Sequence, residues 1–314
     1  MGRHIKFPDA PTICSYLTSD ANVRIIVGPR ESGKTVGSAA GLYMMMCTMP
    51  RGADGLRRSR FLIARPTYGE LERGTMKTWL DWFDEETYGP VRGAGPYVQT
   101  IEFLDVRSEI VFMALNAVDD LKKLRSQEFT AAWFNEGQFA PLRVITEMLD
   151  ITGRYPKKAD CPRYDRKKTL FLDANAPESD LHWMWLMSGK TQLPRDMPED
   201  QRLAYRKPDG WEFFWQPPAL LEKFDAEGSL LGYEVNPKAE NLVNHGDDPY
   251  GTATDGKSRD EITRDFLVRP AASRAGKPRY PKFDKTWNVS EHALEPYEGA
   301  PVVISIDPGS AASA

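Results

Sequence analysis

The segment Gly28-Pro29-Arg30-Glu31-Ser32-Gly33-Lys34-Thr35 limits the possible folds of this chain more than any other feature. It satisfies the pattern GxxxxGK[ST], in which glycines let backbone N–H groups approach phosphate oxygens. Residues 24–27, of which the last three are β-branched, precede it, and residues 35–49, rich in Ala, Leu and Met, predict a helix after it. This order predicts a site for ATP and Mg²⁺, with Lys34 on the β- and γ-phosphates and the Thr35 hydroxyl as a metal ligand.

Further apolar segments predict an α/β fold. Residues 60–64, 129–134 and 168–172 read as buried strands, residues 99–103 and 109–114 as an antiparallel hairpin, and residues 13–17, 70–88 and 142–149 as helices. Strands that alternate with helices predict a mostly parallel central sheet flanked by helices. We expect an ATPase core over residues 1–185, a smaller lid or linker subdomain over residues 186–300, and the first strand of a truncated further domain within residues 301–314.

Composition excludes little by itself. The formal net charge of −4 gives no overall signal for nucleic-acid binding, although short basic runs at residues 57–60, 122–125 and 163–168 could form a local patch or simply solvated surface. The three cysteines are far apart in sequence, so we expect reduced thiols and no zinc site. The apolar run at residues 42–47 is too short to span a bilayer and residues 1–10 lack a signal-peptide core, so we expect an intracellular protein without a membrane partner.

Two predicted strands end at acidic residues, as a P-loop hydrolase requires for Mg²⁺ and for the attacking water. One ends in Asn135-Glu136, where Glu136 stands in the position of a catalytic base. Asn135 replaces the usual aspartate; it can hydrogen-bond a magnesium-bound water but brings no charge. The other strand ends at Asp173, an alternative acid, and leads to Asn175, which either senses hydrolysis or is an ordinary turn residue.

One basic and one aromatic residue complete the candidates drawn from the residues alone. Arg30, inside the loop, could reach the γ-phosphate and stabilise charge in the transition state, or it could be an exposed loop arginine. Tyr16, before the first strand, is a weak candidate for an adenine contact.

Three motifs together resemble the large terminase subunit of tailed bacteriophages, the ATPase that drives DNA into procapsids. They are residues 28–35 with an arginine inside the loop, Leu124-Arg125-Ser126-Gln127-Glu128-Phe129 continuing to Asn135-Glu136, and Leu172-Asp173-Ala174-Asn175-Ala176-Pro177 with His182-Trp183 soon after. The resemblance spans roughly residues 22–310. It implies a P-loop ATPase of the additional-strand (ASCE) type followed by a lid subdomain.

The resemblance also implies roles and partners. Glu136 would be the catalytic glutamate, Asn175 part of the coupling motif, and Arg125 an arginine finger acting on a neighbouring subunit. The active form would be a homo-oligomeric ring, pentameric in the family, that works in the host cytoplasm on the portal protein of a procapsid. It would act on double-stranded DNA selected with a small terminase subunit. Asp307 looks like the first metal carboxylate of the family's RNase H-like nuclease, whose other carboxylates are missing, so we expect no nuclease activity from this chain.

Other functions remain open at this stage. A helicase or another nucleic-acid translocase would share the core but would need strand-separating motifs, and a small-molecule kinase would want a shorter chain with an arginine-rich lid. A structural component that binds nucleotide without turnover is also compatible with Asn135.

Overall fold

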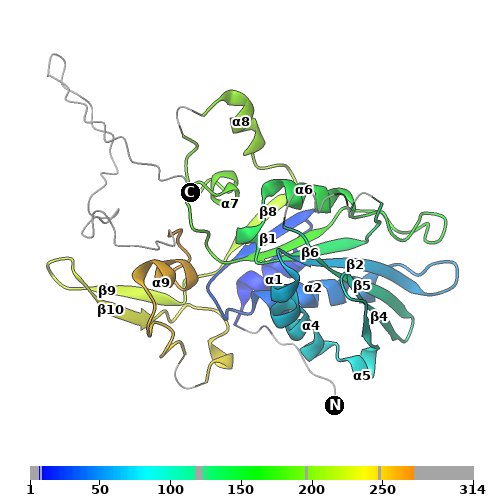
Figure 1. Cartoon of the computed structure of the whole chain (residues 1–314), viewed down its shortest axis with the longest axis horizontal. Coiled ribbons are helices and arrows are strands. Elements are labelled where there is room, and N and C mark those ends of the chain that lie inside the picture. The colour runs from blue at the N-terminus through cyan, green and yellow to red at the C-terminus, as the bar shows by residue number, and fades with distance from the viewer. Residues whose placement is uncertain are drawn as a thin grey trace. The chain divides into compact units, whose positions relative to one another are not determined.

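The predicted strand segments form one mixed sheet in the computed structural model, which describes residues 7–271 apart from residues 8, 117–121, 123, 125, 195–196 and 247–248. Within the described residues the sheet has the order β3-β4-β5-β2-β6-β7-β1-β8 (Figure 1). The strands are β1 (Val23–Val27), β2 (Arg57–Arg65), β3 (Val91–Arg92), β4 (Tyr97–Phe103), β5 (Val106–Ala114), β6 (Ala131–Asn135), β7 (Leu170–Ala174) and β8 (Trp211–Trp215).

In this order, β5, β2, β6, β7, β1 and β8 all run parallel to one another. β4 is antiparallel to β5, as predicted for the hairpin. β7 is inserted between β1, which carries the glycine-rich loop, and β6, which ends at Asn135. This additional strand is the feature expected of the ASCE type. Because the carboxyl ends of parallel strands meet at one edge, the segments after β1, β6 and β7 come together there.

Helices cover both faces of the sheet (Figure 1). One face packs against α1 (Pro11–Thr18), α2 (Lys34–Thr48) and α4 (Lys77–Trp82), through residues such as Ile26, Phe61 and Phe171. The other face packs against α6 (Leu142–Asp150) and α7 (Trp183–Met187), through Ile25, Leu62 and Leu172. Neighbouring strand residues thus belong to opposite cores, which is the period of two that buried strands require.

The predicted helix over residues 70–88 is broken into several pieces. It consists of α3 (Tyr68–Glu70), the π-helix η1 (Leu71–Met76), α4, and α5 (Glu85–Tyr88). The break before α5 has a local cause, because the Asp84 side chain accepts a hydrogen bond from the Thr87 backbone N–H and starts a new helix.

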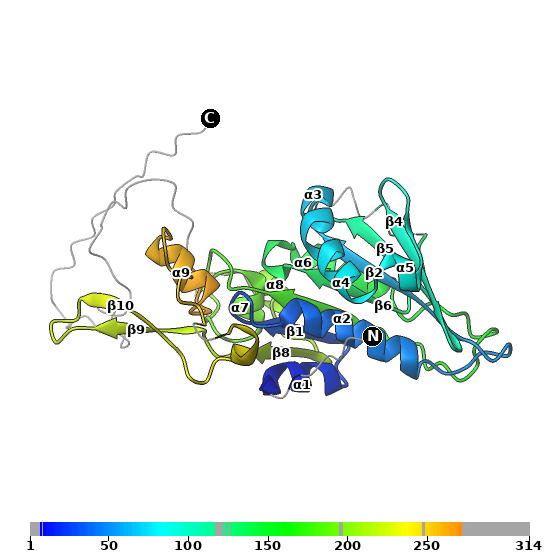
Figure 2. The ribbon, with the colours of Figure 1, turned by 90° about the horizontal axis from the view of Figure 1, so that it is seen from below.

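The sheet extends beyond the predicted boundary at residue 185. The aromatic segment Trp211–Trp215, expected in the lid, is β8 and pairs in parallel with β1. The lid elements that follow are β9 (Leu220–Phe224), β10 (Leu230–Val235), η4 (Leu242–Asn244) and α9 (Arg259–Asp265), with a small core of their own, while α8 (Glu199–Ala204) precedes β8 (Figure 2). The strand predicted at residues 302–306 lies outside the described residues.

Gly41 lets α2 approach the sheet closely. A Cβ atom at this position would lie 2.8 Å from Cε1 of Phe171 and 3.3 Å from Cδ2 of Leu17.

Alanine normally stabilises a helix by about 1 kcal/mol relative to glycine, but overpacking a core costs about 1–3 kcal/mol. We therefore expect Gly41→Ala to lower the free energy of unfolding by on the order of 1 kcal/mol, measured by urea denaturation. In a Phe171→Leu background the same change should be neutral or favourable; equal effects in both backgrounds would contradict this explanation.

Candidate active site

The glycine-rich loop connects β1 directly to α2, as predicted. Gly33 has a φ of 85°, a left-handed conformation that glycine adopts without strain. A Cβ on Gly28 would lie 2.1 Å from Oε1 of Gln216, so this position also excludes a side chain. The loop therefore has the compact backbone needed to surround phosphate oxygens, and its last residues begin α2, whose N-terminal N–H groups favour anions.

Lys34 is buried, and its ammonium group folds back onto the loop. Nζ donates to the carbonyl oxygen of Pro29 at 2.5 Å and to Oγ of Ser32 at 3.3 Å. Burial lowers the pKa of Lys34 to about 8, an effect opposed by the nearby Glu136 and Asp173 carboxylates. Among the described residues no carboxylate contacts this cation directly, and it lies in the position where a polyphosphate would supply negative charge.

A buried amide supports the loop from β8 and the lid, and sequence reasoning missed it. Oε1 of Gln216 accepts a hydrogen bond from Oγ of Ser32 at 2.6 Å, and Nε2 donates to the Ser32 carbonyl oxygen at 3.1 Å and to Oε2 of Glu240 at 2.8 Å. The other oxygen of Glu240 accepts from the Thr12 backbone N–H at 2.8 Å. The sequence does show a polar residue directly after the aromatic segment that forms β8. Its contact with the glycine-rich loop follows only from the position of β8 beside β1.

Glu136 follows β6 at the same edge of the sheet. Its φ of 62° is unusual for a residue with a side chain, and such strain is concentrated at functional sites. Oε2 accepts a hydrogen bond from Nε2 of Gln138 at 2.5 Å, while Oε1 lies 3.7 Å from Nη2 of Arg65 at the end of β2. Glu136 lines a cavity of about 350 Å³ together with Lys34 and Thr35.

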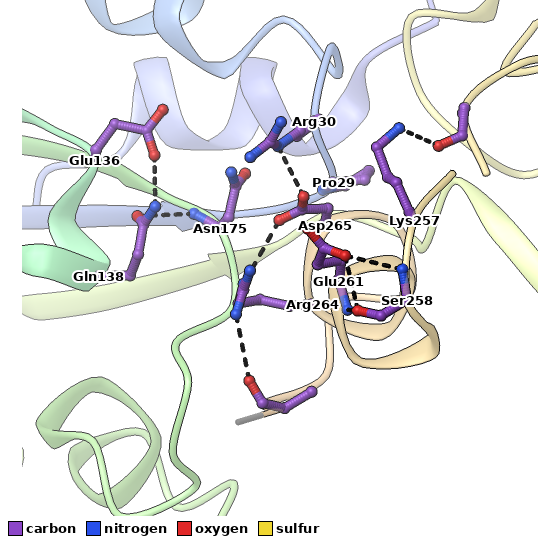
Figure 3. A network of polar contacts seen from close by, with 12 residues as sticks. Pro29, Arg30, Glu136, Gln138, Asn175, Lys257, Ser258, Glu261, Arg264 and Asp265 are labelled. Atoms are coloured by element: carbon purple, nitrogen blue, oxygen red, sulfur yellow. Dashed lines mark hydrogen bonds and ion pairs between the residues drawn. The ribbon is translucent and has the colours of Figure 1, made fainter. Parts of the chain in front are cut away.

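Gln138 connects Glu136 with Asn175 (Figure 3). Its Oε1 accepts a hydrogen bond from the Asn175 backbone N–H at 3.1 Å, while its Nε2 donates to Glu136. Asn175 follows β7 and lines the same cavity. The predicted base and the predicted coupling residue are therefore joined through one side chain, which sequence reasoning did not single out.

A second polar cluster lies between the loop and the ends of β6 and β7. Asp173 is buried and accepts hydrogen bonds from Nδ2 of Asn135 at 2.7 Å, from Oγ1 of Thr35 at 3.3 Å and from the indole N–H of Trp133. Burial raises the pKa of Asp173, and the Trp133 and Asn135 hydrogen bonds oppose that rise. Thr35 and Asp173 supply oxygen atoms of the kind Mg²⁺ prefers, so this cluster fits a magnesium–nucleotide complex.

Arg30 contacts the lid rather than the inside of its own loop. Nε lies 3.0 Å from Oδ2 of Asp265 in α9, and the Arg30 backbone N–H donates to the Asp265 carbonyl oxygen at 2.8 Å (Figure 3). Burial raises the pKa of Asp265, and the Arg30 charge opposes this effect. Arg30, Asp265 and the neighbouring Arg264 line a larger cavity of about 630 Å³, with Glu136 and Asn175 on its other side.

The structure does not place every predicted site residue at this edge of the sheet. Arg125 and Asp307 are outside the described residues, as is Lys123 of the second basic run. Arg57, Arg58 and Arg60 at the start of β2 are each paired with a carboxylate, at distances of 3.0, 2.5 and 2.5 Å. They also lie at the opposite end of β2 from Arg65, which is near Glu136.

The adenine contact proposed for Tyr16 is wrong. The ring is fully buried between α1 and the sheet, and its hydroxyl is 2.9 Å from Oγ of Ser38. A base cannot stack on a side chain that has no exposed surface. Tyr16 instead packs edge-on against Phe171 and Phe214 as part of the core.

His182 makes the stability of this region depend on pH. Its Nδ1 accepts a hydrogen bond from the Met184 backbone N–H and so caps α7, while burial lowers its pKa to about 4.

An unfolded histidine has a pKa of about 6.5, so as the pH falls the unfolded chain takes up the proton first. Stability should be lost between about pH 6.5 and 4, by up to roughly 3 kcal/mol. His182→Asn keeps a capping oxygen but does not titrate, and should flatten the pH dependence of urea denaturation in this range; an unchanged slope would contradict the assignment.

No family model and no curated protein sequence matches the chain. Solved structures do match: the large terminase from a thermophilic bacteriophage has a TM-score of 0.53 at 13% identity, over 83% of this chain and 53% of that one. The ADP complex of the same terminase gives 0.51 at 14% identity, over 83% and 53%, and its complex with ATP-gamma-S gives 0.51 at 15% identity, over 93% and 59%. The chain thus spans a little over half of that terminase.

These similarities confirm at the level of the fold the resemblance predicted from the motifs. The chain has the P-loop ASCE fold of phage large terminase ATPase domains. In the described part of the chain, no helix combines the length and apolar character needed to cross a bilayer.

Proposed function

We propose that the chain is an ATP-hydrolysing motor subunit that moves double-stranded viral DNA into a procapsid. One observation carries the hydrolytic part of this proposal: Glu136, Lys34, Thr35 and Asn175 line one cavity at the carboxyl edge of the parallel sheet. In P-loop hydrolases this arrangement combines a phosphate-binding lysine, a metal-binding hydroxyl and an acid beside the γ-phosphate.

The roles of the residues in hydrolysis follow from their chemistry. Backbone N–H groups of residues 28–35 and the Lys34 ammonium bind the phosphates of ATP. The Thr35 hydroxyl would hold Mg²⁺ together with the nucleotide, and the bound ion would supply charge neutralisation at the phosphate oxygens. Glu136 accepts a hydrogen bond from the attacking water and orients it in line with the scissile bond, while Gln138 and Arg65 hold the Glu136 carboxylate.

Arg30 is proposed to change partners during the cycle. Its ion pair with Asp265 ties the loop to α9 of the lid. Arg30 also lines the cavity with Lys34 and Thr35, so a γ-phosphate bound there would be a second anion that competes with Asp265 for the guanidinium group. Loss of the γ-phosphate would then return Arg30 to Asp265 and move the lid. Gln138, which is hydrogen-bonded to both Glu136 and the Asn175 backbone, would transmit a shift of the Glu136 carboxylate to Asn175.

The proposed partners follow from the family resemblance. Arg125 would act on the ATP of a neighbouring subunit in a pentameric ring, docked in the host cytoplasm on the portal protein of a procapsid, with a small terminase subunit selecting the DNA. Basic residues would hold the DNA through its phosphates, without reading the sequence. The fold similarity to the large terminase of the thermophilic bacteriophage supports this assignment over other P-loop machines.

The substrate can be tested by nucleic-acid stimulation of ATP hydrolysis. A double-stranded DNA motor should be stimulated by linear double-stranded DNA, more than by single-stranded DNA or RNA, and the stimulation should fall as salt rises. Equal or greater stimulation by single strands would favour a helicase or another translocase. Binding of ATP without turnover under any of these conditions would favour a nucleotide-binding structural component.

A further inference from the structure

Asn135 leaves the magnesium site of the proposed ATPase without a charge on β6. The position before the catalytic base carries a carboxamide, which is neutral and cannot balance a divalent cation. Within the described residues there is also no group of three or more His, Cys, Asp or Glu side chains that could hold a metal by itself. A protein carboxylate beside Thr35 would therefore have to come from another strand.

The order of the strands brings one carboxylate to this place. β7 lies between β1 and β6, and Asp173 is paired in register with Ile26 on one side and with Asn135 on the other. Its side chain is 2% exposed, and Oδ2 lies 3.3 Å from Oγ1 of Thr35. Asp173 is thus next to the metal-binding hydroxyl although it follows it by 138 residues in sequence.

Within the described residues, the four side chains that are hydrogen-bonded to the Asp173 carboxylate are all donors to it. Oδ1 faces the indole N–H of Trp133, which is only a donor, and Oγ of Ser38 at 3.3 Å. Oδ2 faces the Asn135 amide and the Thr35 hydroxyl. Both carboxylate oxygens therefore lie where they act as hydrogen-bond acceptors, two donors facing each.

Asn135 is turned away from a metal-binding role. Its Oδ1 is occupied by the Thr75 hydroxyl at 2.6 Å, and its Nδ2 points at Asp173 and, at 3.5 Å, at Oγ1 of Thr35. An NH₂ group can neither bind a cation nor accept a hydrogen bond from a metal-bound water. The geometry fits Asn135 as a residue that orients Asp173.

We infer that Asp173 replaces the missing acidic residue of β6: it accepts the hydrogen bond of the Thr35 hydroxyl when that oxygen binds Mg²⁺, and Asn135 positions it. This inference rests on the proposed ATPase function. A hydroxyl that binds a cation through its oxygen must direct its proton elsewhere, and Oδ2 of Asp173 is the acceptor next to it. Asn175 lies two residues further along the same chain segment, so the magnesium site and the coupling residue are on one strand and the turn that follows it.

The dissociation constant of ADP, measured by calorimetry with Mg²⁺ and separately with EDTA, tests this assignment without relying on turnover. In the wild-type chain Mg²⁺ should strengthen ADP binding. Asp173→Asn should remove most of this gain, lowering the apparent affinity for Mg²⁺ roughly 10- to 100-fold, while ADP affinity in EDTA changes by no more than about threefold. Asn135→Ala should lose only part of the gain, because it removes the amide that orients Asp173 but leaves the carboxylate in place.

Two results would overturn the inference: a folded Asp173→Asn protein that keeps the full gain from Mg²⁺, or a folded Asn135→Ala protein that loses all of it although Asp173 is still present. Thermal unfolding shows whether each variant is folded, and if Asp173→Asn is not, the Asn135→Ala result decides. A folded wild-type chain that binds ADP neither with Mg²⁺ nor with EDTA would overturn the proposed function itself, a distinct outcome.

Discussion

Replacing Glu136 by glutamine is expected to lower kcat for ATP hydrolysis by about 10²- to 10⁴-fold, the usual contribution of a general base. The amide is nearly isosteric and can still bind Gln138, but it cannot accept a proton from water. ATP binding should remain within a few fold of wild type, because Glu136 is not among the groups expected to hold the phosphates. Phosphate release and binding of a fluorescent ATP analogue measure the two effects separately.

Glu102→Gln is a matched control for this change. Glu102 is an exposed carboxylate on β4 that pairs with Arg107, so the same loss of one charge should leave hydrolysis unchanged. If Glu136→Gln turned over ATP as fast as this control, the base would have to be another acid, and Asp173 would be the first to consider.

Replacing Lys34 by methionine should change nucleotide binding and stability in opposite directions. The ammonium group would make charge-assisted hydrogen bonds with phosphate oxygens, each contributing about 1.5–3 kcal/mol, so its loss should weaken ADP and ATP binding by at least about 10²-fold. The nucleotide-free protein, however, buries this cation, and no carboxylate in the described part of the chain contacts it directly. Burying a charge costs free energy because the charge loses its hydration. Methionine fills a similar volume without this cost and should raise the free energy of unfolding by on the order of 1 kcal/mol.

Calorimetric titration with ADP and urea denaturation of the nucleotide-free protein measure the two parts. Lys190→Met is a suitable control, since Lys190 lies over the ring of Trp215 and is exposed. This change removes no buried charge, so it should neither weaken ADP binding nor raise the free energy of unfolding. A Lys34→Met protein that is less stable and binds ADP normally would show that the lysine has a structural role.

The sequence predicted the core of the fold because its signals are local. Strand, glycine-rich loop and helix are consecutive at residues 23–48, and β6 and β7 are short apolar runs. Glu136 and Asn175 could be singled out for the same reason, since each follows such a run. These features depend on chain order alone.

The features that could not be predicted depend on strand order and on contacts distant in sequence. The family resemblance implied the additional strand that separates β1 from β6, but chain order alone did not reveal that this arrangement puts Asp173 beside Thr35. The aromatic segment Trp211–Trp215 was taken for lid because its pairing partner, β1, lies almost 200 residues earlier. The Ser32–Gln216–Glu240 contacts and the Arg30–Asp265 ion pair likewise appear only when loop and lid are folded together.

The measurement that tests the central claim most directly is steady-state phosphate release from ATP by the wild-type chain, followed over a wide range of protein concentrations. A ring ATPase in which Arg125 of one subunit completes the site of its neighbour predicts turnover that rises more than linearly with protein concentration. Turnover at full rate by a demonstrated monomer would contradict the ring mechanism. Tight ADP binding with no phosphate release at any concentration, with or without DNA, would contradict the assignment of the chain as an ATPase.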